Sequence, residues 1–355
     1  MKWVINMDAE KIIHYLKEYK GPEIKIMEVC GTHTSSIFKS GIRSLISPKI
    51  KLISGPGCPV CVTPAAYIDK CIEYAMKENH VLVTFGDMIK VPGEMGSLSQ
   101  VKGQGAKIEL MYSPIELVDK AEKHPDTTYV IAAVGFETTV PAYAITIEEV
   151  EKRGIKNLKL VTALKTVMPA LEWICENEEK INGFICPGHV SVIIGSQIYE
   201  ELAEKYHKPF VVAGFEPEHI LAGIYDIVKQ LEIPNKDEVR VHNLYTNAVK
   251  SEGNTRAQEI IYKYFEPNKA MWRGLGIIED SGLYLKEEYK KYDGGSRGLD
   301  KDIELPESCR CGEVIIGRIN PDECPMFGQV CHPENPYGPC MVSSEGACGI
   351  WYRNI

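Results

Sequence analysis

The chain has 355 residues and a formal net charge of -9, and 44% of its residues are hydrophobic and 25% charged. These proportions are those of an ordinary globular protein, so they exclude a disordered or fibrous chain. The acidic balance and the lack of a basic run argue against nonspecific binding to nucleic acid or to anionic membranes, both of which need clustered Lys and Arg. No apolar stretch is long enough to span a bilayer. The first 20 residues mix charged and apolar residues at helical spacing, unlike a signal peptide, so we expect a cytoplasmic protein.

The first two thirds of the chain alternate short β-rich runs with segments of helical length. Runs rich in Val and Ile at this spacing are typical of parallel sheets built from βαβ units. The runs divide into two groups near residue 125, so we expect an α/β fold with two similar Rossmann-like domains, residues 21–125 and 126–230, that face each other across a cleft. The expected strands are residues 25–30, 51–54, 80–85, 107–112, 129–134, 159–164, 183–186 and 209–213.

Nearly every expected strand ends in a short glycine-rich or small polar turn, such as CGTHT at 30–34 and CPGHVS at 186–191. The carboxyl ends of parallel strands lie at one edge of a sheet, and open α/β sheets bind ligands at that edge. The cysteine, histidine and carboxylate residues of these turns are therefore the candidate site residues.

The turn after the second expected strand carries Cys58 and Cys61 in the sequence GPGCPVCVT. With Thr63 as N-cap and Pro64 as the first helical residue, both thiols would lie at a helix N-terminus. The helix macrodipole favours a thiolate at that position. A structural disulfide framework is not expected in a reducing compartment, so the motif predicts either a reversible dithiol or a pair of metal ligands.

Cys30 ends the first expected strand, and His33 follows it by three residues. The imidazole could hydrogen-bond the sulfur, move a proton or bind metal. A structural zinc site made of Cys30, His33, Cys58 and Cys61 is the alternative. The glycine-rich loops leave backbone amides exposed, which favours an open site.

Four further residues of these turns are weaker candidates for the cleft. Thr32 lies beside Cys30, and Asp87 lies in GDMIKVPG at 86–93. Glu137 lies in GFETT at 135–139, where helix capping by Thr138 and Thr139 explains the motif equally well. His189 lies in CPGHVS, where a backbone hydrogen bond explains it equally well.

Beyond residue 231 the chain becomes rich in Pro and Gly, and such a segment needs a staple to fold. We expect residues 231–355 and the N-terminal helix of residues 1–20 to form a helical and loop-rich domain. Soft thiolates select zinc or iron–sulfur clusters, and structural zinc sites usually pair ligands about two to four residues apart. The long, irregular gaps and intervening apolar residues favour a cluster, with zinc as the alternative. The tail cysteines are Cys309, Cys311, Cys324, Cys331, Cys340 and Cys348.

Six motifs in order resemble those of one known family, the hydrogenase maturation factor HypD. Each motif is weak alone, but the six span nearly the whole chain and are highly specific as a set. They are CGTHT (30–34), GPGCPVCVTP (55–64), GDMIKVPG (86–93), GFETT (135–139), CPGHVS (186–191) and CMVSSEGAC (340–348).

The resemblance implies a scaffold and redox protein on which the Fe(CN)2CO unit of [NiFe] hydrogenase is assembled. It implies two protein partners, the small chaperone HypC and the cyanide donor HypE. By similarity, Cys30 would bind the iron and His33 would support it. Cys58 and Cys61 would form the electron-exchanging dithiol, and Glu345 matches a family position associated with function.

The resemblance also implies a [4Fe–4S] cluster held by four of the six tail cysteines. We expect a scaffold for metallocentre assembly with redox activity rather than a turnover enzyme. Two other functions stay open: an iron–sulfur-dependent protein disulfide reductase that uses Cys58 and Cys61, and a zinc-stabilised interaction module without catalysis. The implied cluster ligands are Cys309, Cys324, Cys331 and Cys348, which leaves Cys311 and Cys340 as spare thiols.

Overall fold

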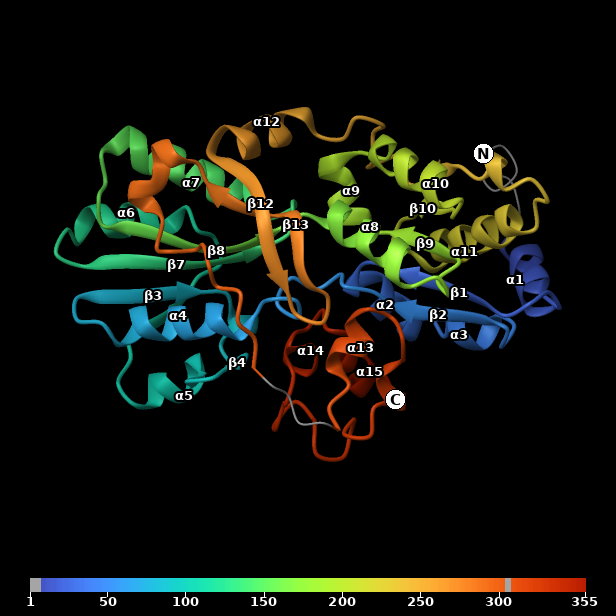
Figure 1. The fold of residues 1–355 in the computed structure, drawn as a ribbon, viewed down its shortest axis with the longest axis horizontal. Coiled ribbons are helices and arrows are strands. Elements are labelled where there is room, and N and C mark those ends of the chain that lie inside the picture. The colour runs from blue at the N-terminus through green and yellow to red at the C-terminus, as the bar shows by residue number, and fades with distance from the viewer. Residues whose placement is uncertain (1–7, 304–307) are drawn as a thin grey trace.

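The computed structural model describes residues 8–303 and 308–355, and within them most strands belong to two large sheets (Figure 1). Sheet A is wholly parallel, with the strand order β11-β10-β9-β1-β2. Its central strands are apolar and buried, as parallel strands covered on both faces must be. The strands of sheet A are β1 (Ile24–Glu28), β2 (Ile50–Ser54), β9 (Gly183–Cys186), β10 (Phe210–Val212) and β11 (Val241–Asn243).

Sheet B has the strand order β12-β13-β8-β7-β3-β6. Its strands β6, β3, β7 and β8 are parallel, and the β12–β13 hairpin adds to β8 in the antiparallel direction. A small separate hairpin pairs β4 with β5. The bounds are β3 (His80–Thr84), β4 (Pro92–Gly93), β5 (Gly96–Ser97), β6 (Ile108–Leu110), β7 (Thr128–Gly135), β8 (Leu158–Lys165), β12 (Phe265–Trp272) and β13 (Gly276–Leu285).

The predicted α/β class with parallel strands is confirmed, and every expected strand is present within two residues of its predicted ends. The division between the sheets, however, does not follow the predicted boundary at residue 125. Strands β1 and β2 pair with β9 and β10, whereas β3 and β6 pair with β7 and β8. Sheet A is therefore built from segments on both sides of that boundary. Apolar patterning identifies a strand but does not identify its partner.

Helices connect the strands, and α8 passes from sheet B to sheet A. Among the helices of the described residues, none combines the length and apolar character that a membrane crossing needs. The helices before α8 are α1 (Ala9–Lys17), α2 (Gly31–Lys39), α3 (Ile42–Leu45), α4 (Ala65–Met76), α5 (Leu98–Gly103), α6 (Glu116–Lys123) and α7 (Val140–Arg153). The later helices are α8 (Val167–Asn177), α9 (Gly188–Ile194), α10 (Glu200–Tyr206), α11 (Pro217–Leu231), α12 (Thr255–Tyr264), α13 (Cys311–Ile315), α14 (Pro339–Val342) and α15 (Ala347–Asn354).

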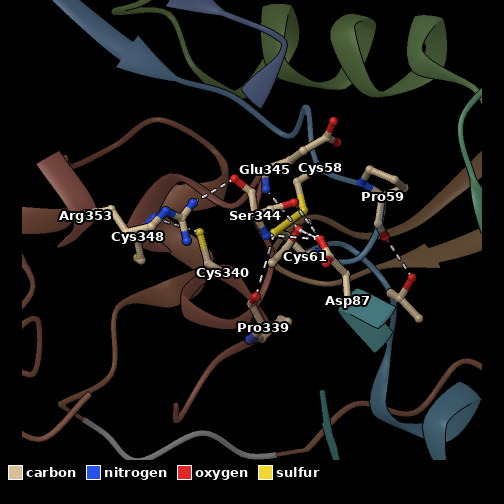
Figure 2. Close-up of a disulfide and its surroundings, with 12 residues drawn as sticks. Cys58, Pro59, Cys61, Asp87, Pro339, Cys340, Ser344, Glu345, Cys348 and Arg353 are labelled. Atoms are coloured by element: carbon tan, nitrogen blue, oxygen red, sulfur yellow. Dashed lines mark hydrogen bonds between the residues drawn. A yellow bond between two sulfur atoms is a disulfide. The ribbon is translucent and has the colours of Figure 1, made fainter. Parts of the chain in front are cut away.

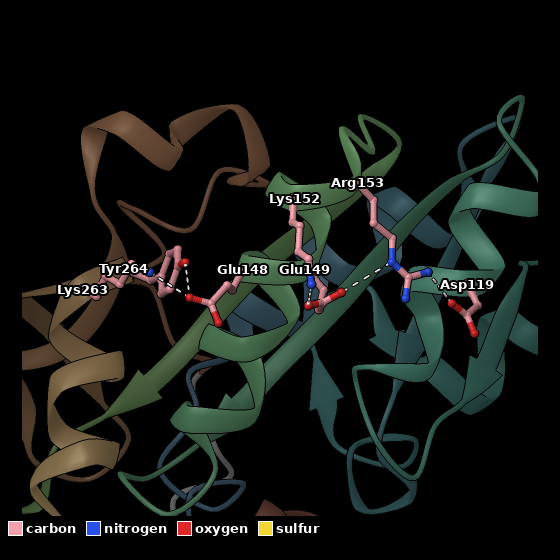
Figure 3. Close-up of polar contacts among 7 residues, drawn as sticks. All are labelled: Asp119, Glu148, Glu149, Lys152, Arg153, Lys263 and Tyr264. Carbon is pink, nitrogen blue, oxygen red and sulfur yellow. Dashed lines mark hydrogen bonds and ion pairs between the residues drawn. The ribbon is translucent and has the colours of Figure 1, made fainter.

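Ion pairs join the outer face of α7 to α6 and α12 (Figure 3). Glu148 of α7 accepts hydrogen bonds from Lys263 and Tyr264 of α12. Arg153 at the end of α7 pairs with Asp119 of α6. Exposed pairs of this kind contribute only about 0–1 kcal/mol each, so they orient α12 while buried apolar contacts stabilise the layer.

The C-terminal tail packs where the two sheets meet, at the lower centre of Figure 1. One continuous apolar cluster contains Met27 of sheet A, Val130 of sheet B and the buried tail cysteines. The N-terminal helix does not join this tail as predicted: Ile12 and Leu16 of α1 are buried beside α11 and sheet A. An apolar helix stripe fits any apolar surface, so the sequence alone could not assign its partner. Residues 1–7 of this prediction lie outside the described residues.

Candidate functional site

Cys58 and Cys61 are joined by a disulfide in the loop that follows β2 (Figure 2). Glycine at position 57 allows this loop to rest directly on the end of β1. A Cβ atom at Gly57 would lie 2.6 Å from the backbone nitrogen of Cys30 and 2.7 Å from its Cα. The backbone N–H of Cys61 also donates to the sulfur of Cys58 at 3.2 Å. Close backbone approach therefore brings the disulfide and Cys30 into one site.

The predicted helix start behind this loop was wrong in detail. Helix α4 begins at Ala65, with Pro64 in the N-cap position, and the hydroxyl of Thr63 donates to the carbonyl of Pro59 at 2.8 Å. The backbone N–H of Ala65 donates instead to Asp302 at 3.0 Å, across a sequence separation of 237 residues. A distant carboxylate thus caps α4, so the amides at its start do not point to the sulfurs as predicted.

Cys30 occupies the N-cap position of α2, and its thiol is buried. Burial raises the pKa of this thiol, and the nearby carboxylate of Glu345 adds to the increase. Hydrogen bonds from the backbone and hydroxyl of Thr32 and from the backbone of His33 act in the opposite direction. Thr32, predicted as a cleft residue, therefore favours the thiolate form of Cys30.

The sequence left three roles open for His33, but its Nε2 makes no hydrogen bond to the Cys30 sulfur and lies instead at two backbone carbonyls. Its Nε2 lies 3.2 Å from the carbonyl oxygens of both Ala213 and Gly214, and burial lowers its pKa to about 4. The ring packs 4.7 Å from Phe215, which also contacts the ring of His189 at 4.2 Å. His33 is therefore a neutral ring that links α2 to the loop after β10.

The alternative zinc site made of Cys30, His33, Cys58 and Cys61 is not formed. The two CxxC sulfurs are bonded to each other, and the imidazole is directed to backbone carbonyls. Within residues 8–303 and 308–355, no group of three or more His, Cys, Asp or Glu side chains converges on a point where one metal ion could sit.

Asp87 holds the tail loop against the edge of sheet B (Figure 2). Its Oδ2 accepts hydrogen bonds from the Ser343 hydroxyl at 3.1 Å and from the Ser344 amide and hydroxyl at 3.0 and 2.8 Å. The next residue, Glu345, packs on Gly31 at the start of α2, where any Cβ would overlap the Glu345 carbonyl oxygen. Partial burial raises the pKa of Glu345, and Asp87 adds to the increase. The tail loop therefore connects the carboxyl edges of both sheets.

Glu137, the other carboxylate candidate, is buried away from the disulfide. Its Oε1 accepts a hydrogen bond from the backbone N–H of Val167 at 2.8 Å, at the start of α8. Burial raises its pKa to about 7. The predicted capping of α7 by the threonine side chains is not formed, because the N-cap residue Thr139 makes no side-chain cap hydrogen bond. Glu137 instead accepts from the start of a different helix, α8.

The disulfide opens on a small cavity, which we call the disulfide cavity. Polar groups from α2 and β2 line one wall, and the tail lines the other. Among its lining residues are Gly31, Thr34, Ser54, Gly57, Cys58, Cys61, Cys340 and Glu345.

The tail cysteines line a second cavity, which we call the cysteine cavity. Five of these thiols are buried, and only Cys309 is partly exposed. Burial and the neighbouring tail thiols raise the pKa of Cys309 to about 11. An all-sulfur donor set with apolar surroundings fits an iron–sulfur cluster, whose thiolate ligands surround a cage rather than converge on one ion. The lining comprises Cys309, Cys311, Cys324, Cys331, Cys340, Cys348, Met326, Phe327, Met341 and Gly338.

Cys340 lines both cavities. Its sulfur accepts a hydrogen bond from the backbone N–H of Cys348 at 3.3 Å and also contacts the thiol of Cys311. On the other side, the sulfur of Cys61 lies 4.0 Å from the carbonyl oxygen of Pro339. A single residue thus separates the disulfide from the cysteine cavity.

The sequence matches a family model and several known proteins. The HypD family model, described as "Hydrogenase formation hypA family", matches residues 6–355. The chain belongs to the HypD family. Hydrogenase maturation factor HypD of Escherichia coli is 40% identical over 93% of this chain and 89% of that relative. A putative hydrogenase expression/formation protein of Methanocaldococcus jannaschii is 40% identical over 98% and 94%, and HypD of Rhodobacter capsulatus is 39% identical over 98% and 91%.

The predicted resemblance to the HypD family is thereby confirmed, but the structure does not bring all six motifs to one cavity. CGTHT, GPGCPVCVTP and CMVSSEGAC meet at the disulfide cavity, and GDMIKVPG reaches the same loop through Asp87. GFETT and CPGHVS contribute Glu137 and His189 elsewhere.

Two charged residues near the two cavities were not predicted from the sequence. Arg273 is the only charged residue in the apolar run AMWRGLGII at 270–278. A single charge in such a run could have indicated a buried functional residue. Asp302 lies in a polar segment and carried no signal, because its role depends on Ala65 far away in the chain.

Proposed function

We propose that this HypD-family chain is a scaffold and redox protein for assembly of the Fe(CN)2CO centre of [NiFe] hydrogenase, not a turnover enzyme. The observation that supports the proposal is the shared position of Cys340 between the disulfide cavity and the cysteine cavity. A disulfide that can be reduced and a thiol-lined metal site lie one residue apart. That arrangement suits electron exchange between them.

A [4Fe–4S] cluster bound in the cysteine cavity would supply single electrons. Reduction of the Cys58–Cys61 disulfide breaks the S–S bond and takes up two electrons and two protons. Cys340 lines both cavities, and Glu345 is a carboxyl group on the wall of the disulfide cavity. We assign the cluster to four residues, Cys309, Cys324, Cys331 and Cys348.

Iron is the cargo in this proposal, and Cys30 is its thiolate ligand on this chain. Soft thiolates suit a ferrous iron that also carries cyanide and CO. A HypC-type chaperone would bind beside Cys30 and supply a second thiolate, and a HypE-type protein would deliver cyanide. A reducing cytoplasm would keep the Cys58–Cys61 disulfide reversible.

The decisive experiment is infrared spectroscopy of the chain purified anaerobically with its HypC-type partner. We expect cyanide and CO stretching bands for the wild type and their complete loss for Cys30→Ala, with the visible absorption of the cluster unchanged. Cys71→Ala is the matched control, because Cys71 is a buried thiol in the core beside Tyr67. Bands retained by Cys30→Ala would exclude Cys30 as an iron ligand.

A cluster-dependent disulfide reductase is the second candidate, and the Cys58–Cys61 disulfide itself favours it. This function does not need Cys30. Repeated turnover of a protein disulfide by Cys30→Ala, in the absence of the infrared bands, would therefore identify the reductase as the function.

A further inference from the structure

Arg273 lies at the turn between β12 and β13 and is only 2% exposed. Its backbone N–H donates to the carbonyl of Val62 at 2.9 Å, directly after the disulfide loop. On the other side of the turn, a Cβ atom at Gly274 would come within 3.1 Å of the Cα of Gly312, the neighbour of Cys311. The turn is therefore wedged between the disulfide loop and a wall of the cysteine cavity.

The guanidinium group of Arg273 has few partners for its N–H donors. One terminal nitrogen lies 2.7 Å from Asp302, which also accepts hydrogen bonds from the amides of Ala65 and Ile303. None of the three guanidinium nitrogens makes an aligned hydrogen bond to any residue in the ranges that the structure describes. A buried guanidinium with five N–H donors is costly unless further negative charge lies close to it.

The tail sulfurs supply negative charge when they bind a metal. Gly312, which the turn contacts at Gly274, is the neighbour of Cys311, and Cys311 lines the cysteine cavity. A buried charge acts strongly on its neighbours because little water screens it. The cysteine cavity that Cys311 lines therefore lies in the field of this cation.

We propose that Arg273 raises the reduction potential of the iron–sulfur cluster in the cysteine cavity and that Asp302 partly cancels its effect. This inference rests on the proposed function, since it requires the cluster. Reduction adds a negative charge to the cavity, and a buried cation nearby stabilises the reduced state. Charge near a cluster is an established determinant of its potential.

The test is a redox titration of the full-length, cluster-loaded chain, followed by electron paramagnetic resonance. Arg273→Gln should shift the midpoint potential to a more negative value. We expect about a tenfold change in the oxidised-to-reduced ratio, which is about 59 mV for a one-electron couple. Asp302→Asn should shift the potential in the positive direction, because it removes the compensating charge and keeps an oxygen that can cap α4. Structural damage would not produce shifts of opposite sign.

Lys165→Met is the matched control. Lys165 is also buried, but its ammonium donates to the Met271 carbonyl at 2.6 Å and lies over the Trp272 ring, on the strand rather than at the turn that contacts Gly312. Its loss should leave the potential unchanged. If Arg273→Gln does not fold, a positive shift in Asp302→Asn still supports the proposal. Unchanged potentials, or shifts of one sign in both variants, would overturn it, whereas a wild-type chain that binds no cluster would overturn the proposed function as well.

Discussion

Glu137 is a carboxyl group inside the protein whose single hydrogen-bond donor is the backbone N–H of Val167 among the described residues. Burial raises its pKa from 4.5 to about 7, against the effect of this hydrogen bond. The folded chain therefore binds a proton at Glu137 more tightly than the unfolded chain does. Stability from this group is present below the unfolded pKa and is lost as pH rises through the folded pKa.

Glu137→Gln should remove that loss, because the amide keeps an oxygen for Val167 and carries no charge. We expect the wild type to lose at most about 3 kcal/mol of unfolding free energy, relative to the variant, between about pH 5 and about pH 8. Urea unfolding at both pH values measures the difference. Glu148→Gln is the contrasting control, since the ion pair with Lys263 lowers the pKa of Glu148. Its contribution is lost only at lower pH, so this variant should keep the wild-type pH slope between about pH 5 and about pH 8. Equal pH slopes for wild type and Glu137→Gln would contradict the assignment.

The loop at 343–345 is the element that carries Glu345 to the disulfide cavity, and it has little regular structure of its own. Asp87 fixes it through three hydrogen bonds, and Arg353 donates to the Ser344 carbonyl at 2.8 Å from the opposite side (Figure 2). The position of Glu345 therefore depends on sheet B, although the residue packs on the start of α2, the helix that follows β1 of sheet A.

Asp87→Ala should release this loop. Loss of hydrogen bonds to a partly exposed carboxylate costs about 1–3 kcal/mol. Hydrogen exchange followed by mass spectrometry should show faster exchange at residues 343–346, with the strands of both sheets still protected. Asp69→Ala is the matched control, because Asp69 accepts from the amides of Glu94 and Met95 in a different loop. Unchanged exchange at 343–346 would show that Asp87 does not hold the loop.

At the scale of the whole molecule, the tail closes the space where the two sheets meet. Its helices α13, α14 and α15 have five, four and eight residues, so local helix formation contributes little to its stability. The apolar cluster that includes the tail cysteines is continuous with the cores of both sheets. An iron–sulfur cluster bound by those cysteines would add the folding energy that the short helices lack.

If the tail binds the proposed iron–sulfur cluster, anaerobic removal of that cluster should loosen the tail before the sheets. We expect proteolysis at residues 308–346 to accelerate by about tenfold or more, with the secondary structure measured by circular dichroism largely retained. Cys324→Ala should reproduce this effect without chelation, since Cys324 lines the cysteine cavity. Cys71→Ala should not, because Cys71 lies in the core between α4 and sheet B. Equal protease resistance of the chains with and without the iron–sulfur cluster would show that the tail folds independently of metal binding.

The sequence by itself determined what local patterning encodes. Apolar runs located the parallel strands of the described residues except β11, and the motifs identified the HypD family and the cysteine-rich character of the tail. Glycine-rich strand ends and cysteine spacing, which are local features, made Cys30, Cys58 and Cys61 candidates, whereas Glu345 was a candidate only through the family resemblance.

The tertiary structure alone decided which distant groups meet. It paired β1 with β9, capped α4 with Asp302, turned the ring of His33 toward Gly214 and buried Arg273 at the turn that contacts Gly312 of the tail. Each of these contacts joins segments whose own patterns are compatible with several partners. Hydrogen-bond and charge partners become specific only when packing fixes distance and excludes water, and neither quantity is present in a local stretch of sequence.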